Sequence, residues 1–169
     1  MTKALLPIVA LSSGDPAGIG PELCLKAAVS SDVLSICQPI IYSDLQVLRC
    51  HVDACGIDVE LEGCKTETEI DWSSSKVKFI ELNLFGNSKF LMGKINKDNG
   101  KASIECVAAP QTEKSIHLAG IEFDCYPSFV ARQTGLLADD VYLMVCFDNY
   151  RIAHCTLHSS VRQSLELIT

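Results

Sequence analysis

The sequence has little positive charge for its length. Its 169 residues include 14 Lys and Arg against 21 Asp and Glu, so the formal net charge is −7. No stripe of basic residues offsets this balance, and an acidic chain repels the phosphates of DNA and RNA. The composition therefore predicts that nucleic acid is not a partner.

Long apolar runs and an export signal are also lacking. No stretch approaches the ~18 consecutive apolar residues that a membrane-spanning helix needs. The opening MTKALLPIVAL leads into a strand-like segment rather than a small-residue cleavage site. We therefore expect a cytoplasmic protein with no membrane partner.

The nine cysteines form no Cys-x-x-Cys pair. Their number is odd, and most lie in apolar runs, where a reduced cysteine behaves as a small hydrophobe. Cys50, His51, Cys55 and Cys64 suggest a zinc site, but zinc ligands usually come in closely spaced pairs. Because Cys50 and Cys55 also fall on a predicted helix, we favour a structural role and keep zinc as the alternative.

What is present is an alternation of strand-like and helix-like segments, which favours the α/β class. Short apolar runs bounded by turn residues predict strands, and apolar residues at helical spacing predict helices. The predicted strands are 7–13, 38–44, 57–62 and 76–83; the predicted helices are 21–31 and 44–55, and Gly56 ends the second. Residues 63–75 and 85–103 have no clear pattern and are expected to be irregular.

A further helix is predicted over 101–109, ended by Pro110. The last third then predicts a hairpin or two neighbouring strands. Two apolar strands, 141–147 and 151–158, flank the turn residues Asp148 and Asn149. Ser160 and Gln163 have the spacing of a capping box, so a short helix is expected after Ser160. A helix of about two and a half turns is marginal alone, so we expect the chain to end in mid-fold.

A glycine-rich segment, SSGDPAGIGPE (residues 12–22), joins the first predicted strand to the first helix. It is not a Walker loop, because no lysine follows its glycines until Lys26. It is not a dinucleotide fingerprint either, because Gly18 and Gly20 would need a third glycine where Leu23 stands. Both nucleotide patterns are excluded by spacing.

Two carboxylates flank the glycines of this segment. Asp15 stands at its start and Glu22 in the first turn of the predicted helix. Free amides at a helix start can hold an anion, but these carboxylates oppose one, and an acid in the first turn also favours the helix dipole. From the residues alone, a tight structural turn is favoured over a ligand loop.

The segment SGDPAGIGPELCLKA resembles the N-terminal signature of 4-hydroxythreonine-4-phosphate dehydrogenases. The resemblance continues through IIYSDLQVLR, NGKASIECV, AGIEF, SFVARQTG and RIAHCTLHSSVRQSLELIT, and so covers nearly the whole chain. It marks Asp15, Gly18, Gly20 and Glu22 as signature residues. It also identifies residues 1–169 as the N-terminal portion of this family's fold.

The resemblance implies an α/β/α sandwich like that of isocitrate and isopropylmalate dehydrogenases, incomplete at the C-terminus. It implies a homodimer with the active site in a cleft between subunits. The implied reaction oxidises 4-phosphohydroxy-L-threonine with NAD and then decarboxylates the product, a step of pyridoxal phosphate (vitamin B6) synthesis. A divalent ion, zinc, magnesium or cobalt, would act as a Lewis acid on the substrate oxygens.

Carried over by residue, the resemblance places the family's metal-binding histidine at His158. His154 shares a strand face with it about 13 Å away, too far to chelate the same ion, and is expected to be structural. The family's substrate-binding Gly-His-Thr-Glu aligns with CYPSF, so Tyr126 and Pro127 stand in place of histidine and threonine. Proline has no side-chain donor.

Further departures leave two alternatives to the family reaction. At the family's Pro-x-x-Lys segment, Glu113 has the lysine's spacing and Lys114 follows one residue later. The family's two other metal histidines lie beyond the aligned region. One alternative is a non-catalytic remnant, or a binding or dimerisation module of the same fold; another is a related phosphorylated hydroxy acid as substrate.

Overall fold

The computed structural model describes residues 6–85, 90–105, 112–123, 125–137, 141–156 and 159–168. The chain divides into two compact units, Met1–Ile121 and Glu122–Thr169, and each is described by itself. Within the described residues, no helix is both long and apolar enough to span a bilayer.

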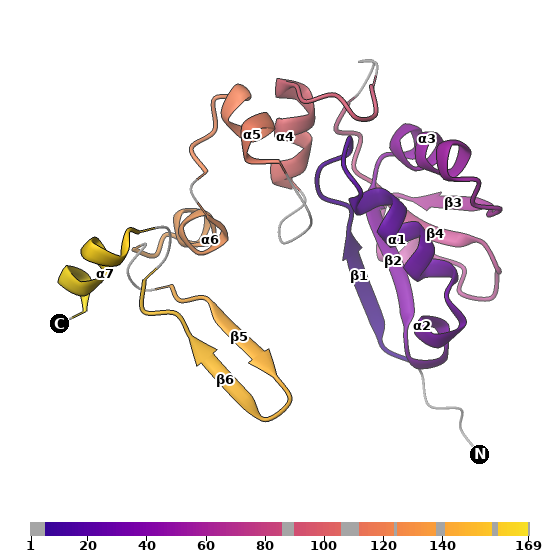
Figure 1. Cartoon of the computed structure of the whole chain (residues 1–169). Helices are drawn as coiled ribbons and strands as arrows, with labels where there is room; N and C mark the ends of the chain where they lie inside the picture. The colour runs from indigo at the N-terminus through magenta and orange to yellow at the C-terminus, as the bar shows by residue number, and fades with distance from the viewer. Residues whose placement is uncertain are drawn as a thin grey trace. The chain divides into compact units, whose positions relative to one another are not determined.

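A parallel sheet of four strands is the centre of the first unit, in the order β1-β2-β4-β3 (Figure 1). The strands are β1 Ile8–Ser12, β2 Gln38–Ser43, β3 Leu61–Cys64 and β4 Val77–Glu81. The predicted α/β class is confirmed. The third strand starts four residues later than predicted, because only from Leu61 does this segment pair with β4.

Three helices connect the first strands: α1 Gly20–Val29, α2 Ser31–Ile36 and α3 Leu45–Cys55. Pro21 lies in the first turn of α1, where its missing N–H costs nothing. Gly56 ends α3 with a left-handed φ of 62°, as predicted. The helix predicted over 21–31 is confirmed up to Val29; Ser30 is extended, and a separate helix, α2, starts at Ser31.

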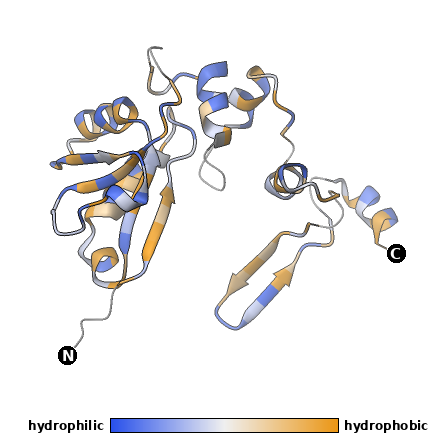
Figure 2. Ribbon diagram, turned by 180° about the vertical axis from the view of Figure 1, so that it is seen from behind, coloured by the Kyte–Doolittle hydropathy of each residue, from blue (hydrophilic) through white to orange (hydrophobic). Residues whose placement is uncertain are grey.

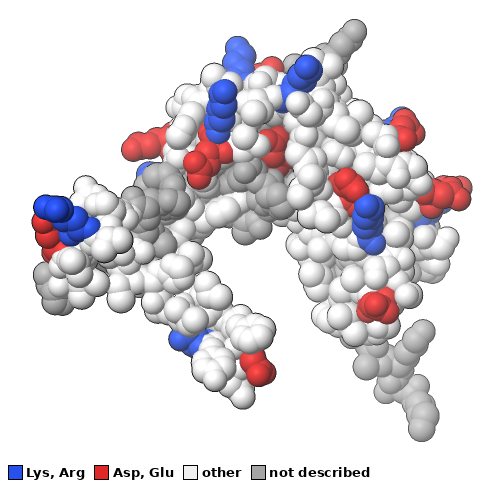
Figure 3. Space-filling view, viewed as in Figure 1, with Lys and Arg blue, Asp and Glu red and all other residues white. Residues whose placement is uncertain are grey.

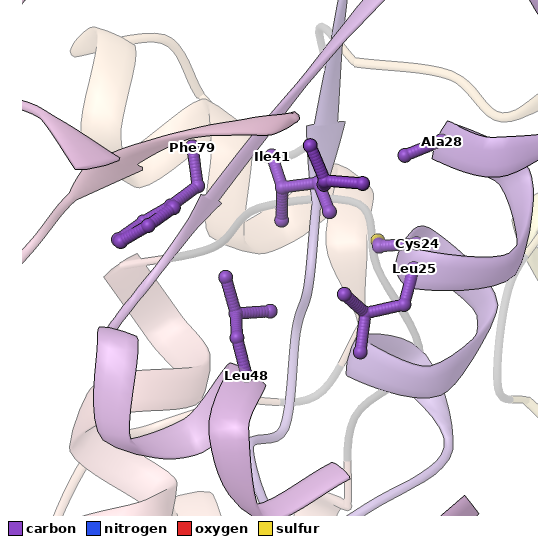
Figure 4. Packing of buried hydrophobic residues seen from close by; sticks show 7 residues of the cluster. Cys24, Leu25, Ala28, Ile41, Leu48 and Phe79 are labelled. Carbon is purple, nitrogen blue, oxygen red and sulfur yellow. The ribbon is translucent and has the colours of Figure 1, made fainter. Parts of the chain in front are cut away.

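The main core lies between one face of the sheet and the helices α1 and α3. Leu25 of α1 and Leu48 of α3 pack with Ile41 of β2 and Phe79 of β4, and all four are at most 2% exposed (Figure 4). Burial of one such side chain contributes about 1.5–3 kcal/mol. This packing fixes the strand and helix ends on which the loops are mounted.

The other face of the sheet is covered by the segment between β3 and β4, which contains a short 3-10 helix, Glu67–Glu69. Ile70 and Trp72 of this segment pack with Ile40 and Ile80. β1 lies at the edge of the sheet and is hydrophobic along most of its length (Figure 2). Its apolar residues are partly exposed, with Ile8 53% exposed.

Two further helices of this unit, α4 Lys97–Glu105 and α5 Glu113–Leu118, pack closely. A Cβ on Gly100 would lie 1.9 Å from the main-chain oxygen of Ser115, so only glycine fits there. The expectation that 85–103 is irregular is wrong from Lys97 onward. The helix predicted over 101–109 exists but starts at Lys97, and residues 106–111 lie outside the described residues.

The second unit contains a helix, a hairpin and a further helix. Its elements are α6 Tyr126–Thr134, β5 Met144–Phe147, β6 Tyr150–Ala153 and α7 Val161–Leu167. The hairpin is confirmed, with shorter strands, and Asp148 takes the positive φ of its turn. The capping box of Ser160 and Gln163 is confirmed as well. In Figure 3 the hairpin surface carries few charges.

Candidate functional site at the carboxyl edge of the sheet

The candidate site lies where the parallel strands of the first unit end. Ligands of open α/β sheets bind outside the carboxyl ends of the strands, in the loops that follow them. Here β1 leads into the glycine-rich segment, β2 into Ser43 and Asp44, and β4 into residues 82–85. These three loops therefore hold the side chains most able to meet a ligand.

In the glycine-rich segment, Asp15 first of all shapes the loop. Its side chain is 3% exposed, and Oδ1 accepts a hydrogen bond from the Ala17 amide at 3.0 Å. Its main-chain oxygen accepts the Gly18 amide, also at 3.0 Å. Gly14 has the left-handed φ of 67°, which glycine adopts without strain. These contacts support the structural-turn interpretation of Asp15.

Gly20 and Glu22 belong to α1. Gly20 is its first residue, and Glu22 lies in its first turn. The Glu22 carboxylate accepts a hydrogen bond from Lys26 and pairs with its charge, which lowers the pKa of Glu22. The pair sits one helical turn apart on the surface, so the visible role of Glu22 is local to α1.

The glycine-rich segment is held from outside by His51 of α3. The His51 ring is 2% exposed, and its Nε2 lies 2.9 Å from the main-chain oxygen of Pro16. Because a carbonyl only accepts, Nε2 carries the proton. The ring also stacks on Phe90, with centroids 6.3 Å apart. His51 therefore anchors the segment, a role that sequence reasoning missed.

A backbone hydrogen bond from another loop holds the same segment. The amide of Gly93 donates to the main-chain oxygen of Ala17 at 3.1 Å. Together with the His51 contact, this bond fixes two consecutive carbonyls of the loop, those of Pro16 and Ala17. These two bonds restrict the motion of the loop.

Two acidic residues, Asp44 and Glu81, lie at the carboxyl ends of β2 and β4. Asp44 is 2% exposed, and its two carboxylate oxygens accept the amides of Leu84 and Phe85 at 2.9 and 3.0 Å. Glu81 accepts the amide of Leu45 at 3.1 Å. Asp44 thus ties the β2 loop to the β4 loop instead of capping α3.

Burial raises the pKa of Glu81, and the nearby charge of Asp44 raises it further. The amide bond from Leu45 acts in the opposite direction. A carboxyl group with a raised pKa keeps its proton to a higher pH than a free carboxyl group does. Sequence reasoning missed Glu81; its place at the end of a strand is the signal that could have found it, but only the fold shows the burial.

Hydroxyl groups complete this edge. Ser13 Oγ donates to the main-chain oxygen of Tyr42 and lies 3.1 Å from Ser43 Oγ. Within the described residues, the buried Oγ of Ser12 has no hydrogen-bond partner. An unsatisfied buried hydroxyl is costly, so Ser12 lowers the stability of this part of the sheet.

The predicted substrate-binding residues lie in the second unit. Tyr126 and Pro127 begin α6, where proline suits the first helical turn. Pro127 is buried, and the Tyr126 ring meets Phe123 edge to face, with centroids 5.5 Å apart. Glu113 and Lys114 are exposed in the first turn of α5.

The predicted metal ligand, His158, lies outside the described residues. His154 follows β6, and its amide donates to the main-chain oxygen of Leu143. Among the residues that the structure describes, no three His, Cys, Asp or Glu side chains are grouped as metal ligands. The described His, Cys, Asp and Glu side chains, including the cysteines near His51 in the sequence, therefore do not form a binding site for a divalent ion by themselves.

Comparison with known proteins supports the family resemblance over almost the entire chain. No protein-family model matches. A 1,2-dihydroxy-3,5-cyclohexadiene-1,4-dicarboxylate dehydrogenase of Comamonas sp is 32% identical over 95% of this chain and 52% of its own length. A Clostridium botulinum protein provisionally named a D-threonate 4-phosphate dehydrogenase is 24% identical over 96% of this chain and 53% of its own.

Solved structures share the fold. A 4-hydroxythreonine-4-phosphate dehydrogenase of Burkholderia phymatum superposes with a TM-score of 0.78 at 20% identity, over 95% of this chain and 53% of that chain. The chain spans about half the length of the curated relatives it matches. The recognition made from the sequence is thus confirmed: over about half their length, the chain is similar in sequence to these two dehydrogenases and shares its fold with the solved 4-hydroxythreonine-4-phosphate dehydrogenase.

Proposed function

We propose that the chain serves an oxidoreductase that oxidises the secondary alcohol of a phosphorylated hydroxy acid, 4-phosphohydroxy-L-threonine, with NAD, followed by decarboxylation. A divalent ion, held in part by His158, would supply Lewis acidity when bound. One observation carries the proposal: similarity to dehydrogenases covers 95% or more of the chain and includes the glycine-rich segment at the carboxyl edge of the sheet.

In this proposal the chain's own residues position the reacting groups. His51 and Gly93 hold the main chain of the glycine-rich segment, so that its position does not change when a ligand enters. Glu81, with its raised pKa, is the group at this edge best placed to move a proton. We further propose that the protein is a cytoplasmic homodimer. In it, Tyr126 and Pro127 of the second unit would belong to the substrate-binding site.

A non-catalytic chain, acting as a binding or dimerisation module, is the second candidate. It is favoured by Pro127, which is buried in the first turn of α6 and offers no side-chain donor where the family has threonine. A substrate oxygen at this position would lose a hydrogen bond, which typically contributes about 0.5–1.5 kcal/mol. A third alternative is that the chain acts on another phosphorylated hydroxy acid, and such compounds should be tested beside 4-phosphohydroxy-L-threonine.

The test is NADH formation by the purified chain, with 4-phosphohydroxy-L-threonine, NAD and zinc, magnesium or cobalt. NADH that depends on substrate and metal supports the first candidate. If no NADH forms, and neither NAD nor metal raises the melting temperature, the first candidate is contradicted and the second holds.

A double variant, Tyr126→His with Pro127→Thr, restores the family residues. If this segment binds substrate, the variant should bind 4-phosphohydroxy-L-threonine about ten-fold more tightly, since one hydrogen bond is worth close to that factor. The helix content of α6, measured by circular dichroism, serves as the control. Unchanged affinity with unchanged helix content would remove these two positions from the site.

A further inference from the structure

A cavity of about 460 Å³ lies at the opposite edge of the sheet from the glycine-rich segment. Its walls include the first residues of β2 and β4, Gln38, Pro39, Val77 and Lys78. Because parallel strands all start at one edge, the cavity is separated from the candidate site by a strand length, roughly 15–20 Å. Its volume is within the usual range of small-molecule sites, about 300–1,000 Å³.

Three different parts of the first unit build the apolar walls. The end of α1 supplies Val29, α2 supplies Leu34, and the segment before β4 supplies Trp72. α2 lies beside the start of β2 (Figure 1). Trp72 also packs on the cluster of Ile40, Ile70 and Ile80, which holds its ring in place. A fixed indole beside aliphatic side chains is suited to a flat apolar group.

The two cations of the cavity are already paired. Lys78 Nζ, whose side chain is 5% exposed, lies 2.5 Å from Glu62, and Lys76 Nζ lies 3.1 Å from Glu60. The hydrogen bond from Lys78 lowers the pKa of Glu62, so this carboxylate stays charged and balances the lysine. An anionic ligand would have to compete with these carboxylates, whereas an uncharged ligand would not.

Gln38 supplies a free polar group. Its main-chain amide donates to Pro7, but its side-chain amide makes no hydrogen bond within the described part of the chain. A carboxamide can both donate and accept. It therefore matches a ligand with an amide, carbonyl or hydroxyl group.

We propose that this cavity binds a small, uncharged, planar molecule with one hydrogen-bonding group, stacked on Trp72 and bonded to Gln38. Nothing in the reaction proposed above uses this edge of the sheet, so the proposal stands independently of that function. A ligand bound here would contact the starts of β2 and β4 and the junction of α1 with α2.

Benzamide is the probe and benzoate its charged counterpart, tested on the full chain. Trp72 is the only tryptophan in the sequence, so its emission reports this cavity without labelling. We expect benzamide to change the Trp72 emission saturably, with a Kd on the order of 1 mM, which is usual for a fragment of this size. Benzoate should bind at least ten-fold more weakly. Amide chemical shifts of Val29, Gln38 and Val77 should move in the same titration.

Leu34→Glu places a charge on the cavity wall and should weaken benzamide binding at least ten-fold. Ile36→Glu is the matched control, because Ile36 is on the same helix, 66% exposed and not in the cavity wall. The proposal is overturned if benzamide changes neither Trp72 emission nor these amide shifts. It is also overturned if benzoate binds equally well, or if the two variants bind benzamide alike.

Discussion

His51 Nε2 lies 2.9 Å from the main-chain oxygen of Pro16, and this bond joins α3 to the glycine-rich segment across 35 positions of sequence. Replacing His51 by Ala removes a buried donor and leaves a cavity beside Phe90. We expect the free energy of unfolding to fall by about 1–3 kcal/mol, measured by urea denaturation. Amide exchange at Ala17 and Gly18 should accelerate.

The control for this variant is Asp53→Ala, an exposed change on the same helix. It should leave both stability and amide exchange close to those of the natural sequence. Equal loss of stability in the two variants would mean that the His51 bond does not anchor the segment.

Gly100 is required by the contact between α4 and α5. A methyl group there would lie 1.9 Å from the main-chain oxygen of Ser115, and backbone cannot move aside as a side chain can. Gly100→Ala should therefore lower the free energy of unfolding by about 1–3 kcal/mol, although alanine favours helix. Thermal unfolding measures this loss of stability. The control is Lys101→Ala, at the exposed next position, which should leave the free energy of unfolding nearly unchanged.

Glu81 should make stability depend on pH in a definite direction. Its folded pKa is raised above 4.5 by burial, so the folded state holds its proton more tightly than the unfolded state. The resulting stabilisation is complete below about pH 4.5 and is lost as pH rises through the folded pKa. Glu81→Gln keeps an acceptor for the Leu45 amide but does not titrate.

Urea denaturation between pH 4 and pH 7 gives the comparison. The natural chain should lose stability relative to Glu81→Gln as pH rises over this interval, roughly the range that a raised carboxyl pKa spans. Parallel curves for the two proteins would show that Glu81 has the same pKa folded and unfolded.

The pair of Lys78 and Glu62 should respond unequally to loss of either partner. Lys78 is 5% exposed and Glu62 30% exposed. Glu62→Gln leaves a buried ammonium without its counter-charge, whereas Lys78→Met leaves a carboxylate that still accepts from Ser74 Oγ at 2.9 Å and reaches water. We expect Glu62→Gln to lower the urea midpoint more than Lys78→Met does. The reverse order would show that the lysine is solvated in the folded protein.

Local sequence patterns predicted the structure correctly where residues close in the sequence determine it. The strand, glycine-rich loop and helix at residues 8–29, the Gly56 end of α3 and the Ser160 capping box follow from chemistry within a few residues. They failed where a distant contact decides: residues 97–100 were expected to be irregular, but they form the first turn of α4, against which α5 packs.

The sequence by itself determined the α/β class and the family resemblance, because hydrophobic periodicity and a specific signature are properties of the chain order. Tertiary structure decided what the residues of the candidate site do. Only in the fold is His51 seen to anchor the glycine-rich segment, and Asp44 to bridge two loops. The reason is physical: burial and long-range hydrogen bonds depend on which segments meet, and no local pattern encodes the meeting of residues some 35–41 positions apart.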